Sequence, residues 1–269
     1  MSGGAGERGN GSRRIAKHGV GGKVAALIPA AGSGTRLGMG FKALVDVGGK
    51  SLLERAIVNL APYVDEVVVA INSEMQGEVE RLLERLSPPL PFLDRAARLG
   101  ENGTFRASPP IGPVRLSPSV ILGGPTRQLS VKNLLEATSA EFVLIHDAAR
   151  PFLEARVILD MLRAVKTRGA ATVALKSADT LISSSGEVWG DLLDRSQTYA
   201  IQTPQGGRRD WLQAAHVQAL EGGWEATDDA GLLARAGHRV HLVRGDSRLF
   251  KVTTQEDLHM ARALAHSIA

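Results

Sequence analysis

A glycine-rich loop with two cations is the part of this sequence best suited to chemistry. Residues 29–36 read Pro-Ala-Ala-Gly-Ser-Gly-Thr-Arg, and Lys42 follows six residues after Arg36. A glycine loop after a strand brings backbone N–H groups close to phosphate oxygens. Two cations beside Gly32 and Gly34 suit a polyphosphate better than a nicotinamide dinucleotide, because several phosphate charges must be neutralised before a nucleophile can approach. The alternative is a tight turn that carries two solvated cations.

The spacing of this loop excludes two well-known phosphate-binding motifs. The dinucleotide fingerprint G-x-G-x-x-G needs its third glycine at position 37, which is Leu37. A P-loop needs G-x-x-x-x-G-K-[ST]; Gly49-Lys50-Ser51 supply its end, but Leu44 stands where the first glycine should be. The loop therefore matches neither motif, and a polyphosphate site of another kind and a tight turn with solvated cations both remain open.

The elements that must position this loop alternate between strand and helix. Such alternation predicts an α/β fold with a Rossmann-like, mostly parallel sheet and helices on both faces. Ligands bind such sheets at the carboxyl ends of strands, which directs attention to the loops after Ile28, Leu122, Ile145 and Val252. Expected strands cover residues 24–28, 66–71, 120–122, 142–145, 171–175, 239–243 and 249–252, and expected helices cover 51–60, 74–86, 128–137, 154–167, 208–220, 228–236 and 255–265.

Three segments fall outside the alternation. Residues 1–23 are rich in Gly, Ser and basic residues and are expected to form a disordered tail before the domain of residues 24–269. Residues 87–118 are rich in proline and are expected to form a long surface loop. Residues 176–200 contain two short apolar runs around Ser-Ser-Ser-Gly, which predicts a hairpin or projecting β-arm.

Composition excludes several classes of protein. The 269 residues include no cysteine, so there is no disulfide scaffold, cysteine nucleophile or thiolate metal site. No apolar run approaches the roughly 18 residues of a membrane span. Residues 1–23 lack the apolar segment of a secretory signal, so a cytoplasmic location is expected.

The positive charge of the chain lies in its tail. Residues 1–23 hold five basic residues and one acidic residue, five minus one being +4, the net charge of the whole chain. The domain of residues 24–269 is therefore neutral overall, and we expect no nucleic-acid partner for it. Weak binding of the tail to nucleic acid or an anionic surface is a separate hypothesis, with a solvated tail as its alternative.

Three further segments carry a resemblance to a known family. They are His146–Pro151, which reads His-Asp-Ala-Ala-Arg-Pro, Gln202–Gln205, which reads Gln-Thr-Pro-Gln, and Lys251–Leu258, which reads Lys-Val-Thr-Thr-Gln-Glu-Asp-Leu. Together with the glycine loop, and in this order, they resemble the 2-C-methyl-D-erythritol 4-phosphate cytidylyltransferases, which have a nucleotide-diphospho-sugar transferase type of fold.

The resemblance implies a reaction. The phosphate of methylerythritol phosphate attacks the α-phosphorus of CTP, pyrophosphate leaves, and CDP-methylerythritol forms in non-mevalonate isoprenoid precursor synthesis. No covalent enzyme intermediate is implied. Catalysis would rest on positioning and charge stabilisation, with Mg²⁺ or another divalent cation bridging phosphates.

The resemblance also implies roles for the triphosphate site. Arg36 and Lys42 match the pair that holds the triphosphate and stabilises the pentacoordinate centre, beside Gly32 and Gly34 of the loop. Lys251 matches a lysine near the α-phosphate and the acceptor phosphate. The residue before Lys42 is Phe41, where the family usually has proline.

A second group of matches concerns the nucleoside and the metal. Gly124 and Ser130 match positions that contact cytidine. Pro125 stands where many relatives have a polar residue, and proline has no N–H for a base contact. Asp147 matches an aspartate close to the ribose, the phosphates and the metal. Its alternative is a turn or helix cap.

A third group concerns the acceptor. Arg150 matches a substrate-site arginine. Thr180 and Arg195 match arm residues that reach the methylerythritol phosphate of the neighbouring subunit, with Arg195 also counted among the catalytic residues. The resemblance therefore implies a homodimer with shared active sites. A solvated charge on the arm is the alternative for Arg195.

Other titratable residues are expected to be structural. His146 precedes the turn and has no second histidine at metal-ligand spacing. Asp228 and Asp229 follow Thr227 at an expected helix start and are interpreted as caps. Two functional alternatives stay open: a cytidylyltransferase for another polyol phosphate, such as ribitol 5-phosphate, and a catalytically weak binding protein of the same fold.

Overall fold

The computed structural model describes residues 22–32, 34, 38, 40–86, 98–99, 105–106 and 118–268. The predicted tail lies outside the described residues except for Gly22 and Lys23. The predicted loop of residues 87–118 also lies outside them, except for Pro118 and two short strands. These strands, β5 (Arg98–Leu99) and β6 (Phe105–Arg106), pair in antiparallel fashion.

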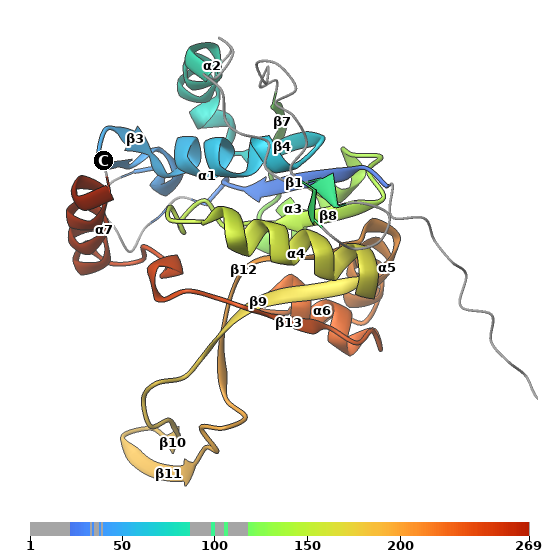
Figure 1. Ribbon diagram of the computed structural model, residues 1–269, viewed down its shortest axis with the longest axis vertical. Coiled ribbons are helices and arrows are strands. Elements are labelled where there is room, and N and C mark those ends of the chain that lie inside the picture. Colours follow the sequence, from blue (N-terminus) through green and yellow to red (C-terminus); the bar gives the residue numbers. More distant parts are fainter. Residues whose placement is uncertain are drawn as a thin grey trace, which may run out of the picture.

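A seven-stranded sheet forms the centre of the molecule, as Figure 1 shows. Its order from edge to edge is β13-β9-β12-β8-β1-β4-β7. The pairs β13–β9, β8–β1, β1–β4 and β4–β7 are parallel, whereas β12 runs antiparallel to both β8 and β9. The predicted mostly parallel α/β sheet is confirmed. Its strands are β1 (Val24–Pro29), β4 (Glu66–Ile71), β7 (Ser119–Leu122), β8 (Phe142–Ile145), β9 (Ala170–Lys176), β12 (Tyr199–Arg208) and β13 (His241–Arg244).

Helices cover both faces of this sheet because its central strands are apolar on both sides. In β1, Ala26 and Ile28 pack into the same core as α1, α2 and α4, whereas Ala25 and Leu27 pack into the core of α3, α5 and α6. The helices are α1 (Leu52–Leu60), α2 (Gln76–Leu86), α3 (Arg127–Glu136), α4 (Ala155–Arg168), α5 (Arg209–Glu221), α6 (Asp229–Arg235) and α7 (Gln255–Ile268). Within the described part of the chain, no helix is both long and apolar enough to cross a membrane.

Local sequence sets the start of α1. The Ser51 hydroxyl accepts a hydrogen bond from the Glu54 backbone N–H at 3.1 Å, which satisfies one of the free N–H groups at the helix N-terminus. The helix expected over residues 51–60 is therefore confirmed, with Ser51 as its cap. Across the described residues, 3₁₀ turns supplement the helices at η2 (Lys42–Leu44), η3 (Ala61–Tyr63), η4 (Ser73–Met75) and η5 (Ser247–Leu249).

The C-terminal helix packs against a small ribbon that follows the glycine loop. This ribbon consists of β2 (Asp46–Val47) and β3 (Lys50–Ser51). Val47 shares a buried cluster with Leu258 and Ala261 of α7, and the same cluster includes Val252. The packing therefore brings the segment before α7 close to the segment that carries Lys42.

The arm projects from the body between β9 and β12, as Figure 1 shows. Its hairpin consists of β10 (Ile182–Ser185) and β11 (Val188–Leu192), which pair in antiparallel fashion and turn at Gly186 with φ 62°. The predicted hairpin is confirmed, with both strands shifted toward the C-terminus relative to the expected runs at 180–182 and 187–189.

Two expectations about strands need correction. The strand β12 was not expected, because Pro204, Gly206 and Gly207 are residue types depleted in strands. A Cβ on Gly206 would overlap the Val143 carbonyl oxygen, so the close approach of β8 requires glycine there. The strand expected over residues 249–252 is wrong. Leu249 ends η5, and the Val252 N–H donates to the Ala149 carbonyl at 2.9 Å instead of joining the sheet.

Candidate functional site

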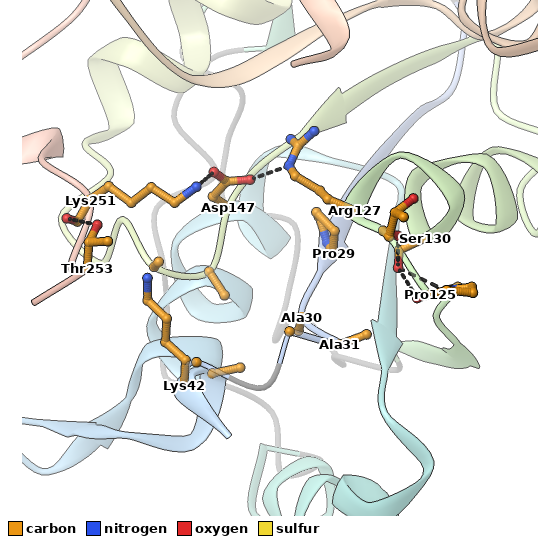
Figure 2. Close-up of a pocket in the computed structure, with 17 residues that line it drawn as sticks. Pro29, Ala30, Ala31, Lys42, Pro125, Arg127, Ser130, Asp147, Lys251 and Thr253 are labelled. Atoms are coloured by element: carbon orange, nitrogen blue, oxygen red, sulfur yellow. Dashed lines mark hydrogen bonds and ion pairs between the residues drawn. The ribbon is translucent and has the colours of Figure 1, made fainter. Parts of the chain in front are cut away.

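The order of the sheet marks one place for a ligand. From β1 the chain moves to β4 and β7 on one side and then returns to β8 on the other side of β1. In open α/β sheets, the crevice outside the carboxyl ends of strands at such a reversal binds ligands. A pocket of about 390 Å³ lies at this point, and Figure 2 shows the residues around it.

Five segments of the chain line this pocket. They include most of the residues predicted from the sequence and add Arg127. Arg36 lies outside the described residues, and Arg150, Thr180 and Arg195 are not part of the lining. The predicted residues that do line it are Gly32, Gly34, Lys42, Gly124, Ser130, Asp147 and Lys251.

The glycine loop packs closely on Lys42. Gly34 has φ 63°, a left-handed conformation that favours glycine, and a Cβ at this position would lie 2.6 Å from the Lys42 Cβ. Lys42 is the first residue of η2, which directly follows the loop. Figure 2 shows its ammonium group directed across the pocket toward Asp147 and Lys251. The loop and η2 therefore place a cation opposite the end of β8.

The loop after β7 forms the opposite wall and is held by Ser130. The Ser130 hydroxyl accepts from the Gly124 N–H at 3.0 Å and donates to the Thr126 carbonyl at 2.9 Å. A Cβ on Gly123 would lie 2.5 Å from the Ala31 Cβ, so this glycine lets the two loops pack together. Ser130 is 3% exposed and fixes the shape of this wall. Pro125 also lines the pocket and offers no N–H to a ligand.

A carboxylate held between two cations lies at the end of β8. One oxygen of Asp147 lies 2.8 Å from the Lys251 Nζ, and the other lies 3.1 Å from the Arg127 Nε. Burial alone would raise the pKa of Asp147, but the charges of Arg127 and Lys251 outweigh burial and hold its pKa well below the usual range. Asp147 is therefore ionised at neutral pH.

The turn that carries Asp147 is fixed by buried hydrogen bonds. The Thr203 hydroxyl accepts from the Asp147 N–H at 3.1 Å and lies 3.0 Å from the His146 Nδ1. The His146 Nε2 lies 3.1 Å from the Arg150 carbonyl, which can only accept, so this nitrogen carries the proton. Burial lowers the pKa of His146 to about 4 and keeps the ring neutral at pH 7. The interpretation of His146 as a structural residue is consistent with these contacts.

Arg150 ties the Lys251 segment to the same turn. Its Nη1 donates to the Leu249 carbonyl at 2.6 Å, and its Nη2 lies 3.5 Å from the Ile201 carbonyl. Together with the hydrogen bond between Val252 and Ala149, this contact places Lys251 beside the end of β8. The predicted contact of Arg150 with substrate stays a prediction.

Arg127 was not predicted from the sequence. This residue begins α3, contacts Asp147 through Nε and lies 2.9 Å from Asp229 through Nη1. The signal was its place in the loop after β7, at the carboxyl edge of the sheet, where a cation can reach the pocket. Of the two expected caps, Asp228 is confirmed, because its carboxylate accepts from the Gly231 N–H at 2.7 Å. Asp229 is not a cap but a buried ion-pair partner.

The pocket lies at the reversal point of a doubly wound sheet, and two glycine-containing loops and lysines from two segments border it. Such a crevice is typical of α/β enzymes that bind nucleotide phosphates. The family follows from comparison with known proteins. The model of the IspD family, 2-C-methyl-D-erythritol 4-phosphate cytidylyltransferase, matches residues 24–267. This chain belongs to that family.

Relatives and solved structures agree with this assignment. The 2-C-methyl-D-erythritol 4-phosphate cytidylyltransferase of Deinococcus radiodurans is 50% identical to this chain over 242 residues, which make up 90% of this chain and 89% of the relative. The crystal structure of the cytidylyltransferase from Thermus thermophilus aligns with a TM-score of 0.68 at 36% identity and covers 91% of this chain and 99% of its own. The 4-diphosphocytidyl-2C-methyl-D-erythritol synthase structure from Anaerococcus prevotii gives 0.71 at 26% identity over the same shares.

Proposed function

We propose that this protein transfers CMP from CTP to 2-C-methyl-D-erythritol 4-phosphate, forming CDP-methylerythritol and pyrophosphate in non-mevalonate isoprenoid precursor synthesis. Family membership over residues 24–267 is the observation that carries this proposal. The pocket supports it, because Lys42, Asp147 and Lys251 converge at one end of the sheet. Transfer to ribitol 5-phosphate is not favoured, since the matching relatives carry the methylerythritol phosphate name.

The residues of the pocket account for the chemistry by charge and position. A phosphate oxygen of the acceptor forms a bond to the α-phosphorus of CTP while the bond to the pyrophosphate oxygen breaks. Lys42 and Lys251 stabilise negative charge on the phosphates. Arg36 is proposed to take the same role because it matches the family's phosphate-holding arginine. The ionised Asp147 carboxylate holds the Lys251 ammonium at 2.8 Å before substrates bind. No covalent enzyme intermediate is needed.

We propose that Mg²⁺ assists the reaction and that Asp147 is its protein ligand. Among the described residues no group of three His, Cys, Asp or Glu side chains could hold a metal ion. A single carboxylate fits Mg²⁺, which is commonly bound by one or two carboxylates together with substrate phosphates and water. When bound, the cation neutralises phosphate charge.

We infer that the protein acts as a homodimer through its arm. The side chains of Val188, Trp189 and Leu192 in β11 are 69%, 68% and 65% exposed. Several large apolar side chains exposed together on one hairpin are typical of an interaction surface. Thr180 and Arg195 lie on the same arm, away from the pocket of their own chain. A second copy that covers the arm would receive these two residues at its own pocket.

Pyrophosphate release tests the reaction directly. The purified protein is incubated with CTP and Mg²⁺, and methylerythritol phosphate and ribitol 5-phosphate are supplied as separate acceptors. We expect strong release with methylerythritol phosphate alone. Release with ribitol 5-phosphate alone would keep the mechanism and overturn the acceptor. No release with either acceptor would favour a binding protein of the same fold.

A mixing experiment tests the shared site. Lys42→Ala disables the pocket of its own chain, and Arg195→Ala is proposed to disable the pocket of the partner chain. A mixed dimer then contains one pocket with both residues intact, so exchange between the two inactive variants should restore about a quarter of wild-type turnover. Two variants that stay inactive after exchange, or an Arg195→Ala variant that is active alone, would contradict the shared arrangement.

A cytoplasmic location is part of the proposal. The sequence contains no cysteine and so has none of the disulfides common in secreted domains.

A further inference from the structure

Arg127 lies between two carboxylates that come from different parts of the fold. Its Nε lies 3.1 Å from the Asp147 Oδ1, and its Nη1 lies 2.9 Å from the Asp229 Oδ2. Arg127 begins α3, Asp147 follows β8 and Asp229 begins α6. The guanidinium is planar and presents its donors in fixed directions, so two carboxylates on different edges determine its orientation.

The Asp229 side chain does not line the pocket. It is 1% exposed, whereas the Arg127 side chain is 30% exposed. The Asp229 backbone N–H donates to the Gln205 Oε1 at 2.8 Å, which ties the start of α6 to β12. On its far side, the His216 Nε2 lies 3.5 Å from the Asp229 Oδ1. Buried contacts therefore hold Asp229 in place within the protein interior.

The charge of Asp229 is maintained by Arg127. Burial alone would raise the pKa of the Asp229 carboxyl, but the Arg127 charge, together with the contacts from His216 and Arg127, outweighs burial and lowers this pKa. Lys251, Asp147, Arg127 and Asp229 then form a row of alternating charges whose sum is zero. The row begins at Lys251, which is 42% exposed in the pocket, and ends in the buried interior.

The two cations of this row differ in their freedom to move: Lys251 can leave its carboxylate, whereas Arg127 is held by two. Lys251 forms its ion pair with Asp147 from an exposed side chain, so its ammonium can turn to a phosphate when substrates bind. Arg127 has two carboxylate partners, one of them fully buried. If Asp229 lost its charge, the guanidinium would be drawn toward the triphosphate, and the Asp147 carboxylate would lose its fixed partner.

We propose that Asp229 is a positioning residue: by holding Arg127 it fixes the Asp147 carboxylate, which holds the Lys251 ammonium in the pocket until it turns to the reacting phosphates. The proposal rests on the proposed cytidylyltransfer. It assigns Asp229 an effect on turnover although its side chain does not line the pocket. The alternative is an ion pair that only attaches α6 to α3, which would affect stability but not the chemistry of the folded enzyme.

The substitution Asp229→Asn tests the proposal, with Asp228→Asn as its matched control. Both changes remove one negative charge at the start of α6, but only Asp229 contacts Arg127, and Asn caps a helix as well as Asp does. We expect kcat of Asp229→Asn to fall about tenfold or more while KM for CTP changes less than about twofold, because misplacement of reacting groups lowers turnover more than binding. Asp228→Asn should keep wild-type kcat.

Wild-type activity in the same assay separates this test from a failure of the proposed function. An inactive wild type would refute the cytidylyltransfer itself. An active wild type with Asp229→Asn at the same kcat, measured below the unfolding temperature of both, would overturn the positioning role. A shift in Tm without loss of kcat would assign Asp229 to stability alone.

A double-mutant cycle identifies the path of the effect. If Asp229 acts through Arg127, then adding Asp229→Asn to an Arg127→Gln variant should leave kcat unchanged within about twofold. A further large loss in the double variant would overturn the proposal. The double variant carries neither charge of this ion pair, so the comparison remains available if Asp229→Asn alone does not fold.

The conservative variant Asp229→Glu separates charge from shape. It keeps the carboxylate, and we expect its kcat to lie closer to that of the wild type than to that of Asp229→Asn. Equal loss in both variants would show that the shape of the side chain matters and not its charge, which would also overturn the proposal.

Discussion

The turn after β8 and the arm between β9 and β12 both carry residues proposed to bind substrate, under opposite physical conditions. His146 is fully buried, and Asp147 is 8% exposed. The turn is held by Thr203, by the Arg150 carbonyl and by two ion pairs. In the arm, β11 is exposed along its whole length, and its hydrogen bonds are local.

This difference shows how the fold divides its work. The turn is held in place by contacts within its own chain, so the nucleotide side of the pocket is formed before any ligand arrives. The arm buries little of its apolar surface within its own chain, which leaves that surface available to a second copy. The rigid part and the exposed part respond to different changes.

The largest expected effect comes from a substitution that removes a charge from the pocket and leaves the fold intact. Lys42→Ala should lower kcat about 10³-fold, because a cation that stabilises developing charge at the phosphates is lost. The matched control is Lys50→Ala in the exposed ribbon strand β3, which should keep wild-type kcat. Steady-state kinetics and thermal unfolding of both variants provide the measurement. Turnover retained in Lys42→Ala would contradict the assignment of this pocket as the active site.

A pH-dependent effect of intermediate size comes from the turn. The pKa of His146 is about 4 in the folded protein and about 6.5 in the unfolded chain. Between these two pH values the unfolded state therefore binds a proton that the folded state does not bind. Stability should be complete above about pH 6.5 and fall by about 3 kcal/mol as the pH drops to about 4. Urea unfolding at several pH values measures this slope for the wild type and for His146→Gln.

The histidine variant sharpens the comparison between the two regions. The arm of residues 177–199 contains no histidine, so it contributes nothing to this slope. The slope between pH 6.5 and 4 should shrink in His146→Gln, whatever its overall stability. An unchanged slope would contradict a neutral, buried His146. Asp147 acts in a separate window, because its lowered pKa affects stability only below its ordinary value near 3.8.

The smallest expected effect is a difference in unfolding free energy between the same substitution, Thr→Val, made in each of the two regions. Thr203→Val removes a buried hydroxyl that serves Asp147 and His146, and should cost about 2 kcal/mol of unfolding free energy. Thr198→Val removes an exposed contact with the Asp194 carbonyl, and should cost less than about 0.5 kcal/mol. Denaturant unfolding of both variants measures the difference. Equal costs would refute the contrast between a tied turn and a loosely held arm.

The sequence was sufficient where local patterns decide the structure. The apolar runs at 66–71 and 142–145 become β4 and β8 with the same bounds, because a strand buried on both faces needs an unbroken apolar run. Ser51 was recognisable as a cap from the Glu that follows it three residues later. The grouping of Lys42 and Lys251 with Asp147 was implied by the family resemblance, whereas the strand expected to carry Lys251 does not form.

The sequence was insufficient where distant backbones and charges decide. In β12, Gly206 and Gly207 serve the close packing of β8 and β9, a need that a single sequence does not reveal. The pair of Arg127 and Asp229 joins two helix starts far apart in the chain, and no local spacing announces such a pair. The direction of Arg150 toward the Leu249 carbonyl depends likewise on tertiary contacts.

The arm leaves and rejoins the body at one point, where the Ser177 N–H donates to the Thr198 carbonyl at 3.1 Å. A segment whose two ends are neighbours can change in length or sequence with little effect on the sheet that carries it. Under the role proposed for the arm, acceptor preference can thus diverge in evolution by replacement of residues 178–197, while the nucleotide-binding half is inherited unchanged. For an engineer, the same boundary is the place to graft a foreign arm onto this scaffold.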